Sequence, residues 1–230
     1  MLDRRQILRT AAASPAVLFS RQAFAREPTT DAARVVHTTD VPNSEPSPAA
    51  LVEDWITPVE RFYVRSHAPT PSIDPGEFRL TVEGMVDRPL ELSLADLKRM
   101  PQRTVTATMT CAGNRREEHS RTKPVPGVQW QAAAIGNATW TGVPLAVVLR
   151  RAGIADGAEH VWFDGLDRVE RPGGVIPFGA SIPLDKAMAE HRSTAGGAAP
   201  GALVVHAMNG RPLEPDHGFP VRTVVPGYIG

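Results

Sequence analysis

The sequence contains a single cysteine, Cys111, among its 230 residues. One thiol cannot form an intramolecular disulfide, and it excludes a zinc site built from several cysteines. The sequence also has no excess of positive or negative charge, since 25 basic side chains balance 25 acidic ones. This balance argues against a general nucleic-acid-binding surface. No G-x-G-x-x-G or P-loop motif occurs, so a nucleotide-binding fold has no support. The length and the 42% hydrophobic content instead suit one domain with a substantial core.

The first 25 residues have the order of an export signal. Arg4 and Arg5 precede a weakly apolar stretch from Thr10 to Phe19, and Ala23-Phe24-Ala25 has a small-x-small cleavage pattern. The apolar stretch is shorter than the roughly 20 residues that a helix needs to span a bilayer. Residues 1–25 are therefore predicted to be a twin-arginine signal peptide for the periplasm, and no membrane span is expected. A frayed amphipathic helix is the alternative.

The rest of the chain predicts an α+β fold with mixed β-sheets and short helices. Residues 26–50 are rich in threonine, proline, serine and alanine, which predicts a linker or an extended arm on the surface. Residues 51–230 are predicted to form one domain, because strand and helix patterns mix there without a regular βαβ order. Strands are expected at 78–84, 104–110, 160–163, 203–208 and 220–225, and helices are expected to begin at Ser93, Thr141 and Ile182.

The densest group of reactive side chains follows the strand expected at 104–110. It reads Thr110-Cys111-Ala112-Gly113-Asn114-Arg115-Arg116, in which Gly-Asn permits a tight turn and two guanidinium groups would attract an oxyanion. A tyrosine-phosphatase loop is excluded, because Cys-x5-Arg needs an arginine where Glu117 stands. A papain-like nucleophile lacks the expected neighbouring sequence and an assignable histidine. A single thiolate on a redox metal fits if a cofactor supplies the other ligands. An inert cysteine beside solvated arginines is the alternative.

Cys111-Ala112-Gly113-Asn114-Arg115-Arg116 resembles the signature of the sulfite oxidase family of molybdenum enzymes. Further motifs of that family occur in the same order between about residues 55 and 230. They are Phe62–His67 (with Ser66 where the family has asparagine), the stretches around Trp130 and Trp140, 163–167, 178–183 (with Phe178 where the family usually has tyrosine) and 209–228. Several ordered motifs make the resemblance more specific than any one of them alone.

The resemblance implies a molybdopterin-binding fold of the sulfite oxidase type, in which a pterin dithiolene holds molybdenum. It implies that Cys111 is the one protein ligand of the metal, that Arg65 and Arg116 line a sulfite pocket and that Trp130 forms its wall. Planar guanidinium groups suit a small oxyanion. The residues that would bind the pterin and its phosphate are Tyr63, His67, Asp167, His217 and Arg222. Arg115 is expected to be either a pocket residue or half of a loop ion pair.

The activity that the resemblance implies is oxidation of sulfite to sulfate. A separate cytochrome c-type protein is expected to accept the electrons, because the chain has no Cys-x-x-Cys-His haem motif, as in a bacterial periplasmic sulfite dehydrogenase. The family continues beyond the position of Gly230 with an Ala-Arg-x-Val-Lys-Trp segment, a catalytic tyrosine and an immunoglobulin-like dimerisation domain. The domain is therefore expected to be incomplete at its C-terminus and inactive alone, and a homodimer is expected only with that further domain.

Two alternatives remain open from the sequence. The first is a related molybdopterin oxidoreductase that acts on another sulfur compound or on a sulfoxide. The second is a non-catalytic remnant that binds an anion or a pterin.

Overall fold

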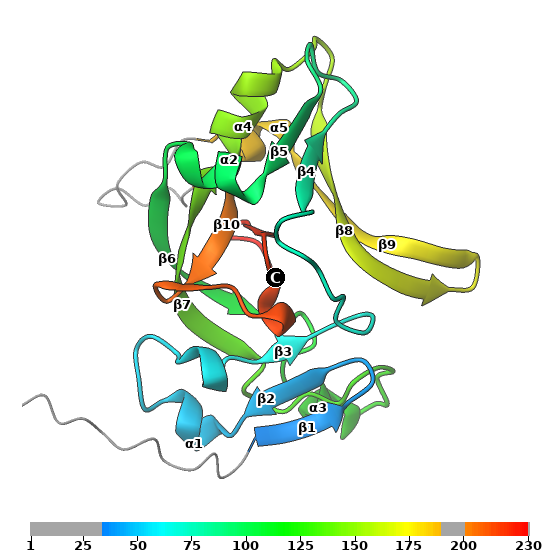
Figure 1. Ribbon diagram of the computed structural model, residues 1–230. Coiled ribbons are helices and arrows are strands. Elements are labelled where there is room, and N and C mark those ends of the chain that lie inside the picture. The colour runs from blue at the N-terminus through cyan, green and yellow to red at the C-terminus, as the bar shows by residue number, and fades with distance from the viewer. Residues whose placement is uncertain (1–33, 190–200, 230) are drawn as a thin grey trace, which may run out of the picture. The chain divides into compact units, whose positions relative to one another are not determined.

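The computed structural model describes residues 34–189 and 201–229 (Figure 1). The predicted signal peptide at 1–25 lies outside these ranges. Within them the chain folds into four antiparallel sheets with short helices between them, so the predicted α+β class is confirmed.

The largest sheet has the strand order β11-β10-β7-β6, with β12 paired to the other part of β10. These strands are β6 (Arg103–Thr110), β7 (Ile135–Pro144), β10 (Leu203–Met208), β11 (Arg211–Pro212) and β12 (Arg222–Val224). Threonine and apolar residues alternate along β6, so one face of the strand packs on the core and the other faces away. The β10–β11 turn has Asn209 at φ 51° and Gly210 at φ 76°, as the sequence Asn-Gly favours in a tight hairpin.

Three smaller sheets complete the architecture (Figure 1). One contains β1 (Arg34–Thr38), β2 (Asn43–Pro46) and β3 (Val64–Arg65) in that order. A second pairs β4 (Arg79–Val82) with β5 (Leu90–Ser93), and a third is the long ribbon of β8 (His160–Arg171) and β9 (Gly174–Pro183). Residues 34–46, expected to belong to a linker or a surface arm, instead contain β1 and β2 and are part of the fold, because β1 pairs with β2 and β2 pairs with β3.

The helices are short and lie mostly at strand ends. They are α1 (Pro48–Leu51), α2 (Leu94–Arg99), α3 (Arg116–Ser120), α4 (Leu145–Ala152) and α5 (Leu184–Met188), with 3-10 turns η2 (Val59–Arg61) and η3 (Pro215–His217). The helix predicted from Ser93 is confirmed, since Ser93 and Asp96 cap α2 reciprocally.

Two helix starts were predicted too early. Residues 141–144 continue β7, because the sheet pairs them with β10, and α4 begins only at Leu145. Likewise, Ile182 and Pro183 end β9, and α5 begins at Leu184. Pairing with a neighbouring strand, β10 for β7 and β8 for β9, supplies hydrogen bonds that the local sequence pattern does not reveal.

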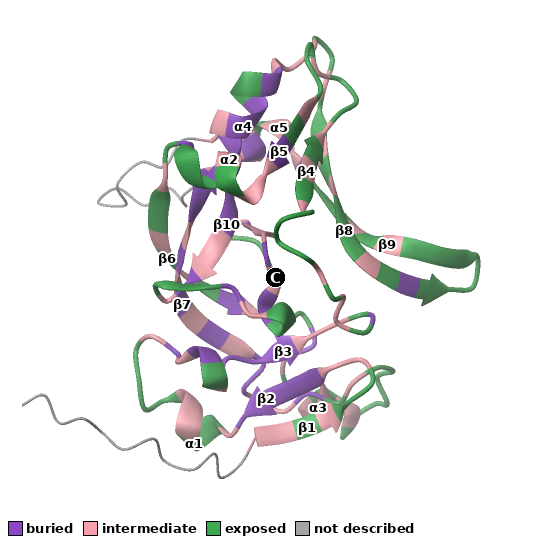
Figure 2. Cartoon of the chain, in the orientation of Figure 1, coloured by how far each residue is buried: buried purple, intermediate pink, exposed green. Residues whose placement is uncertain are grey.

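Buried side chains form two apolar clusters. The first lies on β6, β7 and β10 and includes Cys111, Trp130 and Trp140. The second packs α2, α4 and α5 against Val143 of β7 and Val204 of β10, and Val204 lies between Leu203 and Val205 of the first cluster. Figure 2 shows β2 and much of β10 buried, whereas the β8–β9 ribbon is largely exposed. The first cluster therefore surrounds the predicted site.

Candidate functional site

Cys111 lies at the end of β6, where the chain leaves the sheet. Its side chain is buried, with 8% of the residue exposed. Its backbone N–H donates to the carbonyl of Ala134 at 2.9 Å, and its Sγ accepts the N–H of Gly113 at 3.3 Å. The carbonyl of Cys111 accepts from Asn114 N at 2.9 Å. A tight turn thus holds the thiol in one place, with a backbone donor directed at the sulfur.

A second segment, residues 130–134, is bound alongside this turn. We call residues 111–117 the cysteine loop and residues 130–134 the strap. Arg115 N donates to Gln131 O at 2.7 Å, and Glu117 N donates to Trp130 O at 3.0 Å. The side-chain Oδ1 of Asn114 accepts the N–H of Ala134 at 3.1 Å. The strap therefore fixes the conformation of the loop that carries the thiol.

Arg116 and Trp130 approach each other across Gly113. A Cβ at Gly113 would lie 2.8 Å from Trp130 Cδ1 and 2.9 Å from Arg116 Nη2, and one at Gly127 would lie 2.6 Å from Arg116 Nη1. Only glycine leaves room for the guanidinium group at these two positions. Arg116 Nη1 also donates to Val128 O at 3.0 Å. The structure thus brings Cys111, Arg116 and Trp130 together around Gly113, while their roles in binding metal and sulfite stay predictions.

Arg115 was expected to be either a pocket residue or half of a loop ion pair, and it forms the ion pair. Its guanidinium group pairs with Glu118 at 2.6 Å and its side chain is 61% exposed. It is therefore half of a loop ion pair on the surface.

Tyr63 and Arg222 lie on another side of the site. Tyr63 is 5% exposed and meets Trp130 edge to face with the ring centroids 6.5 Å apart. Burial raises the pKa of the Tyr63 phenol well above its usual range; Arg222 opposes this shift and Cys111 adds to it. Arg222 Nη1 donates to His217 O at 3.2 Å, and the guanidinium group lies 5.4 Å from the ring centre of Trp140. Arg222 Nη2 also lies 3.4 Å from Met109 Sδ, on β6 two residues before Cys111.

His217 is buried, with 4% of the residue exposed, and its Nε2 lies 3.4 Å from Val59 O. Its ring meets Phe62 edge to face at 5.7 Å. Burial, assisted by the charge of Arg222, lowers the pKa of His217 to about 4. The imidazole is therefore neutral at physiological pH.

We expect His217 to make the fold sensitive to acid. Between its usual pKa of 6.5 and the folded value of about 4, the unfolded chain binds a proton that the folded chain does not. The free energy of unfolding then falls as the pH falls through this window, by up to about 1.4 kcal/mol per pH unit. Urea unfolding at about pH 7 and about pH 5 should show a larger loss for the wild type than for His217→Gln. The exposed His160→Gln should keep the wild-type dependence; equal losses in wild type and His217→Gln would contradict the expectation.

Three of the predicted residues have no described contact that joins them to Cys111. Arg65 donates to Asn43 Oδ1 at 3.3 Å and to the carbonyl of Ser66, and its Nη2 lies 3.3 Å from His67 Nδ1. His67 is exposed and stacks on Phe178 of β9 at 4.5 Å. Its pKa is lowered to about 4 by partial burial and by the charges of Arg65 and Arg171.

Asp167 lies on β8, within the irregular part of its pairing with β9. Partial burial raises the pKa of its carboxyl group. The pterin-binding roles of Asp167 and His67 and the sulfite-binding role of Arg65 remain predictions, as do the roles of the other predicted site residues.

The residues around Cys111 suit a bound group that carries hydrogen-bond acceptors. Among the described side chains, Trp130 Nε1 and Arg222 Nε are the buried nitrogen atoms without a hydrogen-bond partner. An unpaired buried donor costs about 1–3 kcal/mol, so two of them near one buried thiol favour a ligand that accepts from both. The donor set, one soft thiol with cationic and neutral N–H groups, fits a metal held by an anionic organic cofactor.

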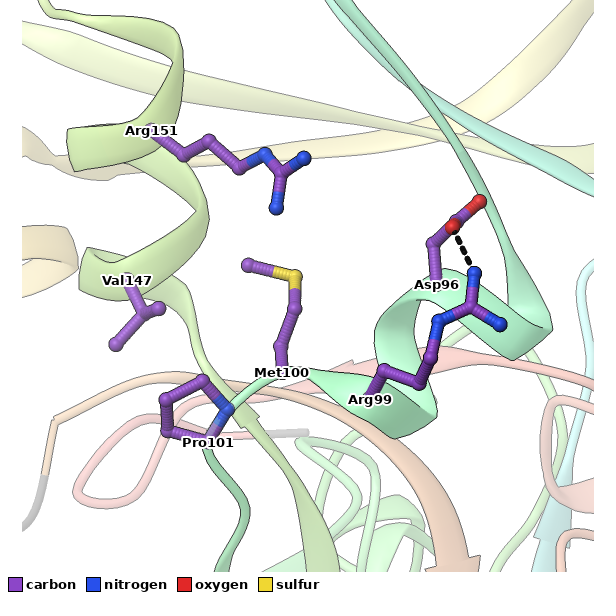
Figure 3. Close-up of a pocket in the computed structure, with 6 residues that line it drawn as sticks. All are labelled: Asp96, Arg99, Met100, Pro101, Val147 and Arg151. Atoms are coloured by element: carbon purple, nitrogen blue, oxygen red, sulfur yellow. Dashed lines mark hydrogen bonds and ion pairs between the residues drawn. The ribbon is translucent and has the colours of Figure 1, made fainter.

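One surface hollow is lined by residues of α2, α4 and the turn after α2. It has a volume of about 490 Å³ and is lined by Asp96, Arg99, Met100, Pro101, Val147 and Arg151. Figure 3 shows these side chains coming from α2, from the turn after it and from α4, with Arg99 paired to Asp96. A second hollow of about 210 Å³ includes His217 among its lining residues. The first contains none of the predicted site residues.

Comparison with known proteins identifies the family of the chain. Residues 67–230 match the family described as the oxidoreductase molybdopterin binding domain. The chain belongs to this family. Membership implies a molybdopterin cofactor, which the buried thiol and the unpaired donors fit.

Sulfite oxidases are among the similar proteins. The chain is 43% identical to sulfite oxidase of Gallus gallus over 221 residues, which covers 94% of this chain and 46% of that protein. It is 46% identical to mitochondrial sulfite oxidase of Mus musculus over 191 residues, covering 82% of this chain and 33% of that protein. The chain thus spans less than half the length of either relative.

A solved structure also shares the fold. The sulfane dehydrogenase SoxCD of Paracoccus pantotrophus superposes with a TM-score of 0.68 at 25% sequence identity, covering 92% of this chain and 52% of that one. The match confirms the predicted molybdopterin-binding fold of the sulfite oxidase type.

Some residues of the site could not be recognised from the sequence. Glu45 and His37 lie in the segment expected to be a linker, yet Glu45 accepts hydrogen bonds from the strap and the ring of His37 contacts Trp130. The side chain of Asn114 binds the strap as well, although the sequence indicated only a turn there. No periodic pattern marks Glu45 or His37, because both act through partners far along the chain.

Proposed function

We propose that this chain is the molybdenum-binding part of an enzyme that oxidises sulfite to sulfate. The observation that carries the proposal is the buried thiol of Cys111, with Arg116 and Trp130 approaching each other across Gly113 beside it. The identity of 43% with a sulfite oxidase supports it. In this proposal Cys111 is the one protein ligand of molybdenum.

In this proposal the side chains of the protein bind and orient the sulfite anion and the cofactor. The cationic Arg116 attracts and orients the sulfite anion, since two glycines leave its guanidinium group space beside the thiol. Trp130 offers its unpaired N–H in a buried setting, where hydrogen bonds to an anion are strong. Tyr63, His217 and Arg222 would hold the pterin. The molybdenum–molybdopterin group, when bound, supplies the two-electron oxidation and the oxygen transfer.

The electron acceptor and the location are part of the same proposal. A separate cytochrome c-type protein would accept the electrons, as the absence of a haem-attachment motif from the sequence suggests. The twin-arginine pattern at 1–25 supports export to the periplasm. Among the described residues, none of the helices is long and apolar enough to cross a bilayer.

A second candidate substrate is a different sulfur compound. The fold shared with a sulfane dehydrogenase at 25% identity favours it. The two candidate substrates differ in the group that they present to Arg116. Sulfite is a small oxyanion, which a guanidinium group binds well. A sulfane sulfur is not an oxyanion and offers no such oxygen atoms.

The test uses the full-length protein, purified from a molybdenum-replete host and supplied with cytochrome c. We expect cytochrome c reduction with sulfite and a much lower rate with sulfane or sulfoxide substrates. Turnover with those substrates and none with sulfite would overturn the choice of substrate. Folded protein without molybdenum, shown by metal analysis and circular dichroism, would indicate a non-catalytic remnant.

Arg116→Gln should mainly raise the sulfite KM. Glutamine removes the charge and shortens the side chain but keeps it polar, and a hydrogen bond to a charged group is worth about 1.5–3 kcal/mol. We therefore expect the KM to rise roughly 10- to 150-fold, with a smaller change in kcat. The matched control is Arg115→Gln, because Arg115 is exposed and pairs with Glu118. Equal kinetics for Arg116→Gln and Arg115→Gln would contradict the assignment.

A further inference from the structure

Glu45 is a fully buried carboxylate on β2, with 0% of the residue exposed. A buried charge is costly unless it is paired and hydrogen-bonded. Both of its oxygens are occupied. Oε1 accepts from Gln131 N at 2.6 Å and lies 2.8 Å from His37 Nε2, and Oε2 accepts from Ala133 N at 2.8 Å. The carboxylate therefore binds two backbone amides of the strap.

These two amides belong to the segment that fixes the cysteine loop. Gln131 O accepts from Arg115 N, and the neighbouring Ala134 binds Cys111 and Asn114. A line of hydrogen bonds thus runs from Glu45 through the strap to the backbone of Cys111. Along this line the carboxylate determines where the strap lies.

His37 adds a contact with the wall of the pocket. Its ring meets Trp130 edge to face, with centroids 4.8 Å apart and an interplanar angle of 68°. The same ring is bound to Glu45 and its side chain is only 13% exposed. The Glu45–His37 pair therefore contacts Trp130 directly through the His37 ring, and it also binds the strap that contains Trp130.

The N-terminal strands also form hydrogen bonds with the segment just before Tyr63. Arg34 on β1 donates to Glu60 O and to Phe62 O, each at 2.9 Å, and its Nε donates to Ser44 Oγ at 2.7 Å. Phe62 directly precedes Tyr63. Residues 34–46 thus connect the segment that carries Tyr63 with the strap that carries Trp130.

The geometry points to Glu45, with His37, as a positioning residue for the Cys111 site. The carboxylate holds the strap, and through it the thiol, Arg116 and Trp130, in a fixed relation. Its effect on catalysis rests on the proposed function, whereas its effect on the strap does not.

Glu45→Gln tests the proposal, because glutamine has the same size but can accept with one oxygen only. In the full-length holoenzyme we expect amide hydrogen exchange to become roughly tenfold faster or more in peptides covering residues 130–134 and 111–117. Peptides from the β4–β5 hairpin should be unchanged. The matched control is Glu60→Gln, since that side chain is 63% exposed. Unchanged exchange in the strap, or an equal rise throughout the domain, would overturn the proposal.

Steady-state kinetics then distinguish a positioning role of Glu45 from an effect on protein stability alone. Glu45→Gln should raise the sulfite KM more than it lowers kcat, and Glu60→Gln should match the wild type. If the wild type does not oxidise sulfite, the proposed function fails while the exchange result still decides the role of Glu45.

A second variant covers the case in which Glu45→Gln does not fold. His37→Ala leaves the carboxylate and both strap amides in place. We expect roughly threefold faster exchange in the strap peptide, because Glu45 then loses one hydrogen bond and Trp130 one ring contact. No rise in that peptide would overturn the proposal.

Discussion

Cys111→Ser abolishes sulfite oxidation and removes molybdenum from the purified protein: this is the expected result with the largest effect on activity. Serine has nearly the shape of cysteine, so the turn that places residue 111 should survive, but a hydroxyl is a poor ligand where a soft thiolate is required. We expect activity to fall by more than about 100-fold, beyond the 10- to 100-fold cost of losing a group that merely supports a metal ligand. Cytochrome c reduction and metal analysis measure the two losses.

The matched control for this variant lies next to it. Ala112→Ser adds the same hydroxyl at an exposed position of the cysteine loop and should retain both metal and activity. Circular dichroism shows whether each variant is folded. Molybdenum bound normally by a folded Cys111→Ser protein would disprove that Cys111 is the ligand.

Trp140→Ala should have the largest effect on stability. Trp140 is fully buried in β7, its Nε1 donates to Ala107 O at 3.2 Å, and Phe62 packs edge to face at 5.9 Å. Truncating a buried tryptophan removes its apolar contacts and leaves a cavity, which costs about 3–5 kcal/mol. Arg222 also loses the ring beneath its guanidinium group. We therefore expect a large drop in the urea midpoint together with weaker retention of molybdenum.

Trp162→Ala is the control for this stability measurement. Trp162 is 64% exposed on the β8–β9 ribbon, and surface substitutions usually change stability by less than about 0.5 kcal/mol. Similar losses of stability in the two variants would show that burial of Trp140 does not account for its contribution.

The sequence predicted those parts of the site that are local. Alternation along 104–110 predicted β6, and the turn residues after it placed Cys111 at the strand end, as the structure shows. Arg116 lies within the same loop. Trp130, although distant in sequence, was placed at the pocket by a family motif and not by any pattern that the residues themselves display.

The parts that could not be predicted depend on partners remote in the chain. Glu45 stands in a short polar segment, and its hydrogen bonds reach residues 86 and 88 positions away. β9 contains Pro177 and Gly179, which weaken any local strand signal, and it forms because β8 pairs with it. Such elements are specified by tertiary pairing, which an isolated sequence window does not contain.

The span of these contacts has a consequence for the order of folding. The β6–β7 pair joins neighbouring stretches of chain, whereas His217 meets Val59 across 158 residues and Asn209 meets Thr57 across 152. Closing long loops is entropically costly and slow, so these contacts should form late. During synthesis, the contacts of His217 with Val59 and Phe62 cannot form before the segment that carries His217 has left the ribosome, so a shorter nascent chain leaves these partners uncovered on that side.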